Sequence, residues 1–225
     1  MRFRIRVKAV VRAVCAALFV LPTLLPIAGA HAQVTATAPV TEVPAYNNRW
    51  EIYGGAQYSH FNPSPGRNIQ ANNLLGWNGT ATVYFHPRWG LEAGARGVYG
   101  TMTVPVNAFN IPAHPNMSEN LFLFGPTIRF HRGQNYAAGM HVLIGGAYGS
   151  FDKDFPAGVQ PDVVDIYNNK LAFAGAIGGW VDRNLSTRLA VRVIADYQPT
   201  HYGFKTQNEF AGSVGIVYKF GQLHK

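Results

Sequence analysis

The chain has little of three things once its first 32 residues are set aside: cysteine, charge and long apolar runs. The single cysteine, Cys15, lies in that first segment, so its removal leaves neither a disulfide nor a cysteine nucleophile. Charged residues make up only 13% of the chain, against roughly 25% in ordinary soluble domains. No apolar run of about 18 residues or more follows the first segment, which excludes a helical membrane span there.

Residues 1–32 have the pattern of a cleavable export signal. A basic stretch over 2–12 precedes an apolar stretch over 14–28, and Ala30-His31-Ala32 forms a small-x-small cleavage site. Removal of this signal takes five of the 19 Lys and Arg residues and leaves 14 against 11 Asp and Glu. The net charge then falls from +8 to about +3, so basicity is no argument for a nucleic-acid partner, and none is expected.

Eight strand-like segments follow a Thr/Ala/Pro-rich periplasmic lead-in at residues 33–48. Long polar connections follow the odd-numbered segments, and tight turns rich in Gly, Pro, Asn and Asp follow the even-numbered ones. This layout predicts an all-β fold, an eight-stranded antiparallel up-and-down transmembrane β-barrel over residues 49–221, with a short tail at 222–225. The strands are expected near residues 50–60, 74–85, 89–102, 119–130, 136–150, 170–181, 186–197 and 209–220.

The strands alternate with period two, and two observations indicate which face is inside. The face opposite the bulky apolar residues is often glycine or alanine, which suits a narrow lumen. An arginine on the lipid face would cost roughly 2–4 kcal/mol near the membrane midplane. The charged face is therefore predicted to line the lumen, as an ionic network of Glu51, Glu92, Arg96, Arg129, Arg188, Arg192, Asp196, Glu209 and Lys219.

Aromatic residues at the strand ends predict two girdles at the membrane interfaces. The tight turns are expected on the periplasmic side, which places both termini in the periplasm. The girdle at the tight-turn end comprises Trp50, Phe85, Trp89, Phe130, Tyr136, Trp180 and Phe220, and the girdle at the loop end comprises Tyr58, Tyr99, Tyr148 and Tyr197.

The last strand, EFAGSVGIVYKF, places Ile216, Tyr218 and Phe220 on one face. It resembles the C-terminal signature of the small OmpA/OmpX-type outer-membrane barrels of Gram-negative bacteria, and the resemblance extends over residues 50–220. It implies an outer-membrane location, delivery by the barrel-assembly machinery, and contact with outer-membrane lipids and lipopolysaccharide. The chain departs from the signature by continuing for five residues beyond Phe220.

The sequence favours a structural or surface-interaction protein with a side-chain-filled lumen and four extracellular loops, and it names no surface ligand. A narrow porin-like channel for ions or small solutes is the first alternative, because small residues on two strands could leave a water-filled passage. A soluble secreted β-barrel is a weaker alternative.

A lipid-A-modifying enzyme is the remaining alternative, but no catalytic motif supports it. The histidines and serines expected near the loop-end rim match no nucleophile–base pattern, so neither a catalytic residue nor a cofactor is predicted. No metal site is predicted either, although four aspartates in the third long loop could bind a divalent cation. The rim residues are His60, His114, His201, Ser59, Ser64 and Ser150, and the loop residues are Asp152, Asp154, Asp162 and Asp165.

Overall fold

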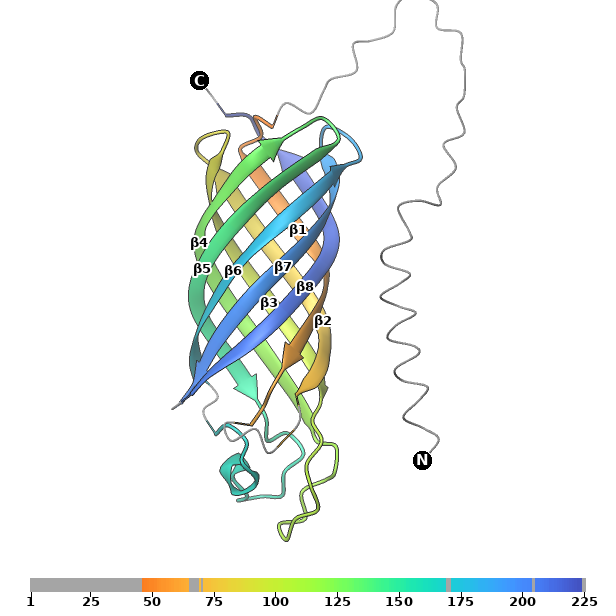
Figure 1. The fold of residues 1–225 in the computed structure, drawn as a ribbon, viewed down its shortest axis with the longest axis vertical. Helices are drawn as coiled ribbons and strands as arrows, with labels where there is room; N and C mark the ends of the chain where they lie inside the picture. The colour runs from red at the N-terminus through yellow and green to blue at the C-terminus, as the bar shows by residue number, and fades with distance from the viewer. Residues whose placement is uncertain (1–45, 65–68, 70, 169–170, 204, 224–225) are drawn as a thin grey trace, which may run out of the picture. The chain divides into compact units, whose positions relative to one another are not determined.

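The computed structural model describes residues 46–64, 69, 71–168, 171–203 and 205–223, so the predicted export signal and most of the lead-in lie outside the described residues. Eight strands in chain order close into a barrel (Figure 1). The elements are β1 (Trp50–Phe61), β2 (Asn72–Tyr84), β3 (Trp89–Thr101), β4 (Asn116–Arg132), β5 (Tyr136–Ser150), the short 3₁₀ helix η2 (Pro161–Val164), β6 (Leu171–Asn184), β7 (Leu189–Tyr202) and β8 (Lys205–Phe220).

Every neighbouring pair of strands is antiparallel, and β1 closes the barrel by pairing with both β2 and β8. At the seam, Glu51 lies opposite Thr82 on one side and Lys219 on the other. A closed ring leaves no unpaired strand edge, which lipid would not tolerate. The predicted fold class, an antiparallel up-and-down barrel, is confirmed.

Side chains alternate between the lumen and the outer wall along each strand. In β7, Ala190, Arg192 and Ile194 are buried, whereas Val193 and Tyr197 are exposed on the outer wall. The strands are 12–17 residues long, more than the roughly 9–11 residues that cross a bilayer. An apolar outer wall around a charged interior suits a barrel whose solvent is lipid.

The predicted fourth long loop, residues 198–208, is wrong. β7 and β8 remain paired up to Tyr202 and Lys205, and the chain turns at Gly203, whose φ of 78° favours glycine. Pro199 is tolerated within β7 because the β6–β7 ladder is interrupted there, with no pair between Ala174↔Thr200 and Ile177↔Tyr197. Proline has no N–H to donate, so it can occupy a position without a ladder bond. Three long loops remain at this end of the barrel.

Candidate functional site: the filled lumen

An ion network fills the lumen at the tight-turn end. The two carboxylate oxygens of Glu51 lie 2.6 Å from Arg129 Nη2 and 2.7 Å from Arg192 Nη2. Asp182 binds Arg192 through two bonds, at 2.6 Å to Nε and 3.0 Å to Nη2. All four side chains are buried, so their mutual pairing offsets the cost of removing these charges from water.

Tyr46, which precedes β1, covers this network. Its ring lies 4.8 Å from the Arg129 guanidinium and 4.2 Å from Lys219 Nζ, and its hydroxyl donates to Asn184 Oδ1 at 2.6 Å. Lys219 donates to the same hydroxyl at 3.1 Å. Burial is the largest cause that raises the pKa of Tyr46 far above its usual value, so the phenol keeps its proton. Tyr46 therefore seals this end of the lumen.

Replacing Tyr46 by Phe is expected to lower the free energy of unfolding by about 1 kcal/mol, because the hydroxyl that joins Lys219 to Asn184 is lost. Tyr46→Ala should cost more, since it also uncovers the guanidinium of Arg129. Urea unfolding of the barrel in lipid vesicles measures both. An alanine variant as stable as the original protein would show that Tyr46 does not seal the lumen.

A second ionic group occupies the middle of the lumen. Arg96 Nη1 lies 2.6 Å from Asp196 Oδ2, and the His141 ring lies between Asp196 at 2.9 Å and Glu92 at 3.2 Å. Arg96 also donates to Gln198 Oε1 at 3.2 Å. These contacts join β3, β5 and β7 across the interior.

Two carboxyl groups meet closer to the loop end, with no cation beside them. Glu119 and Glu209 are both fully buried and lie in contact with each other. Tyr202 donates to Glu119 at 2.8 Å, and Ser59 donates to Glu209 at 2.8 Å. Within the described part of the chain, neither carboxyl has an Arg, Lys or His side chain within 4.0 Å.

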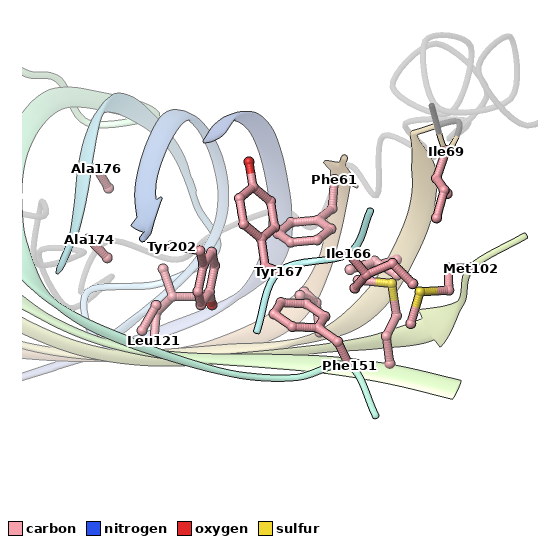
Figure 2. Packing of buried hydrophobic residues seen from close by; sticks show 14 of the residues in the cluster. Phe61, Ile69, Met102, Leu121, Phe151, Ile166, Tyr167, Ala174, Ala176 and Tyr202 are labelled. Carbon is pink, nitrogen blue, oxygen red and sulfur yellow. The ribbon is translucent and has the colours of Figure 1, made fainter. Parts of the chain in front are cut away.

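An apolar plug closes the loop end above these carboxyls (Figure 2). The ring of Phe151 lies 5.7 Å from that of Phe61 and 5.3 Å from that of Tyr202. Tyr167, also from the loop between β5 and β6, lies 5.6 Å from Tyr202, and Ile166 is buried in the same cluster. This loop is fixed to the β1–β2 loop by Ser64 Oγ, which donates to Asp165 at 2.5 Å. The loop thus folds back over the barrel and fills its mouth.

Glycines in the wall make room for these large side chains. A Cβ on Gly149 would lie 2.5 Å from the Phe151 ring and 3.0 Å from that of Tyr202. A Cβ on Gly139 would meet the ring of Trp180, which is buried in the lumen. The small residues that predicted a passage therefore accommodate aromatic rings from elsewhere in the chain.

The structure places eight of the nine residues of the predicted ionic network in the lumen. Arg188 is exposed in the β6–β7 turn, because β7 begins only at Leu189. Glu51 and Lys219 are cross-strand neighbours, but Lys219 lies nearest to Asn184, at 2.7 Å. Glu119, His141 and Asp182 were not predicted as part of the network, although the alternation of β4, β5 and β6 faces all three inward.

Ten of the eleven predicted girdle residues are exposed on the outer wall, between 37% for Phe220 and 66% for Phe85. Trp180 is the exception, since it is 2% exposed and its ring lies 4.1 Å from the Arg192 guanidinium. Its position in β6 has the same parity as Ala174 and Ala176, which face inward. Trp180 therefore belongs to the lumen and was wrongly assigned to the girdle.

No nucleophile–base pair forms among the described rim residues. His60 contacts Asn73 at 2.9 Å and His201 contacts Thr206 at 3.0 Å, while Ser59 and Ser64 donate to carboxylates. His114 and Ser150 have no hydrogen bond to each other or to the other rim residues.

A groove of about 370 Å³ crosses the wall at the interrupted β6–β7 ladder, and it is lined partly by His201. Its lining contains no serine and no carboxylate, so no acid within the groove orients this histidine, whose hydroxyl partner is Thr206.

The aspartates of the third loop are used in local bonds. Asp154 accepts the Asn116 backbone N–H at 2.6 Å, and Asp165 binds Ser64. Across the described residues, no three His, Cys, Asp or Glu side chains are grouped to hold a metal ion. The same residues include no helix long and apolar enough to cross a membrane.

Comparison with solved structures identifies the fold. The attachment invasion locus protein Ail of Yersinia pestis matches at 16% identity with a TM-score of 0.50, over 77% of this chain and 99% of Ail. OprG of Pseudomonas aeruginosa matches at 14% (TM-score 0.47; 77% and 96% covered), and Neisserial surface protein A at 12% (0.46; 76% and 97%). No family model and no curated protein matches. The chain therefore has the fold of the eight-stranded outer-membrane β-barrels, which is the fold that its sequence predicted.

Proposed function

We propose that this protein is a closed barrel of the outer membrane, which spans the bilayer without conducting solutes and presents its long loops as a surface for interaction. The tight turns and both termini face the periplasm in this assignment. The observation that carries it is the filling of the lumen at three levels: the Tyr46-covered ion network, the Arg96–Asp196–His141 group, and the plug around Phe151.

The loop between β3 and β4 supports an interaction role. It extends the two strands as a hairpin, with Met102 N donating to Pro115 O and Val104 N to Ala113 O, both at 3.0 Å. Its tip exposes Val106 and Phe109, and residues 101–118 contain no Asp, Glu, Lys or Arg. An exposed apolar tip on an otherwise polar rim is typical of a contact site. We therefore assign surface contacts, including those with lipopolysaccharide, to this end.

We propose no catalytic role, because the rim histidines and serines bind other partners and not one another. We also propose that the last strand directs assembly through the barrel-assembly machinery. Ile216, Tyr218 and Phe220 share the outer wall, where an assembly factor can reach them.

The unpaired amides of Gln57 and Asn78 favour a second candidate, a narrow channel. Neither amide has a hydrogen-bond partner among the described residues, and both are buried on the lumen side of β1 and β2. Such groups are normally satisfied by water. Water that binds these amides beside Arg96 could fill a sealed chamber, as in a closed barrel, or form part of a continuous passage, as in a channel.

Planar-bilayer recording distinguishes the two candidates. The purified barrel is expected to give no stable stepwise conductance, because both ends of the lumen are blocked. A variant with Phe151, Tyr167 and Tyr202 replaced by Ala serves as the comparison, since it opens only the loop end and should also stay closed. Regular conductance steps from the original protein would overturn the closed-barrel proposal and establish the channel.

A further inference from the structure

The described turns and chain ends at the tight-turn end of the barrel carry positive charge alone. These segments cover residues 46–49, 85–88, 131–135, 183–188 and 221–223, and they contain no aspartate or glutamate. They do contain five arginines, all exposed: Arg49, Arg88, Arg132, Arg183 and Arg188. Within the described ranges, none of the five has a carboxylate within 4.0 Å. We call these five residues the arginine rim.

The loops at the opposite end do not share this one-sided charge. The described loop 151–168 contains four aspartates and one lysine, Lys153. The excess of positive charge among the described residues therefore lies at the tight-turn end, where it can attract an anionic surface.

The arginine rim lies next to the aromatic girdle. Arg49 precedes Trp50, Arg88 precedes Trp89, and both tryptophans are exposed on the outer wall. The guanidinium of Arg183 lies 4.5 Å from the ring centroid of Tyr136, another exposed girdle residue. Girdle aromatics sit at the level of the lipid headgroups. The arginines that flank them consequently reach the layer of lipid phosphates.

We propose that the arginine rim binds the phosphate groups of anionic phospholipids at this face of the membrane. Guanidinium groups bind phosphate through paired hydrogen bonds, and they remain charged at any physiological pH. If the tight turns face the periplasm, which rests on the proposed function, these lipids belong to the inner leaflet of the outer membrane.

The position of Arg183 favours lipid over peptidoglycan as the partner. A rim that bound a polymer in the periplasm would point its cations away from the barrel wall. Arg183 instead stacks on Tyr136, whose ring faces lipid. This stacked position holds the cation beside an outer-wall ring, where a headgroup can meet it.

Fluorescence quenching by brominated lipids tests the proposal with the protein's own tryptophans. A Trp77→Phe background leaves Trp50 and Trp89 as reporters at the rim, with Trp180 shielded inside the lumen. The barrel is reconstituted in phosphatidylcholine with brominated phosphatidylglycerol or brominated phosphatidylcholine. The expected preference for phosphatidylglycerol is about fivefold for each arginine that a headgroup contacts, and high salt should reduce it.

Arg183→Gln should weaken this preference, and replacement of all five arginines by Gln should abolish it. Lys153→Gln, at the opposite end, is the matched control and should leave it intact. A heat-dependent gel shift verifies that each variant is folded. Equal quenching by both lipids, or a preference that survives loss of all five arginines, would overturn the proposal. Arginine-dependent binding to purified peptidoglycan without any lipid preference would overturn it in favour of a periplasmic polymer. Conductance in the planar bilayer would overturn the proposed function alone, because headgroup binding does not depend on a closed lumen.

Discussion

Replacing Glu51 by Gln is expected to lower the free energy of unfolding by about 3–5 kcal/mol. Glu51 is the carboxylate shared by Arg129 and Arg192, at 2.6 and 2.7 Å. Arg192 retains Asp182 after the substitution, but Arg129 loses its only carboxylate partner among the described residues. Arg129 is then a buried cation held by carbonyl and amide oxygens and by the rings of Tyr46 and Tyr84. A buried charge without its counter-ion is among the costliest single defects in a protein.

Urea unfolding in lipid vesicles, followed by tryptophan fluorescence, measures this loss. The double variant Glu51→Gln with Arg129→Met removes both charges, so it should be more stable than Glu51→Gln alone. The difference in the double-mutant cycle gives the coupling between the two groups. Equal stability of Glu51→Gln and the original barrel would show that water, and not Glu51, neutralises Arg129.

The side-chain alternation of this barrel could be predicted from the sequence because one physical constraint repeats along each strand. Lipid on one side penalises charge, so Arg192 and Asp196 must share the inner face while Val193 and Tyr197 share the outer one. The same constraint fixes the register, since a shift by one residue would expose every charge to lipid. Strand number and closure follow from the pattern of connections.

Positions at the strand ends were harder to predict because the lipid constraint ends there. Outside the bilayer, polar residues such as Gln207 and Asn208 are compatible with strand pairing. The ladder between β7 and β8 therefore continues into the segment that was predicted as a loop. Arg188 lies immediately before the first residue of β7, so its side chain is in solvent and not in the lumen. The prediction for Trp180 failed for a different reason. Its aromatic side chain suggested the girdle, whereas the alternation of side chains along β6 places it inside the lumen.

The contents of the lumen could not be predicted, because they depend on contacts between residues far apart in the chain. The plug requires Phe151 and Tyr167 to fold back from a loop onto Phe61 and Tyr202. The pair of Glu119 and Glu209 joins β4 to β8, which are not neighbours in the barrel wall. Alternation indicates that such groups face inward, but not which ones meet.

In the pair of Glu119 and Glu209, replacement of Glu by Gln should stabilise the barrel, which is the opposite of its effect at Glu51. Glu119→Gln is expected to raise the free energy of unfolding by about 1–3 kcal/mol, which is the cost of a buried polar group without a suitable partner. Glu119 Oε2 has no hydrogen-bond partner in the described structure, and the Glu119 side chain lies beside the carboxyl of Glu209. The amide of Gln would donate to Glu209 there, while its oxygen could still accept from Tyr202.

Glu209→Gln is the matched control, because it changes the other half of the same pair. Glu209 already accepts from Ser59 at 2.8 Å and from Gln198 and Thr200 at 3.2 Å, so both of its oxygens face donors. An amide nitrogen at either position would replace one or two of these accepted bonds, and only the hydroxyls of Ser59 and Thr200 could rotate to accept from it, so this variant should gain less stability than Glu119→Gln. Urea unfolding in vesicles compares the two variants directly. If neither variant proved more stable than the original barrel, the two carboxyls would already share a proton or a bound cation, because either one stabilises two adjacent buried carboxyls.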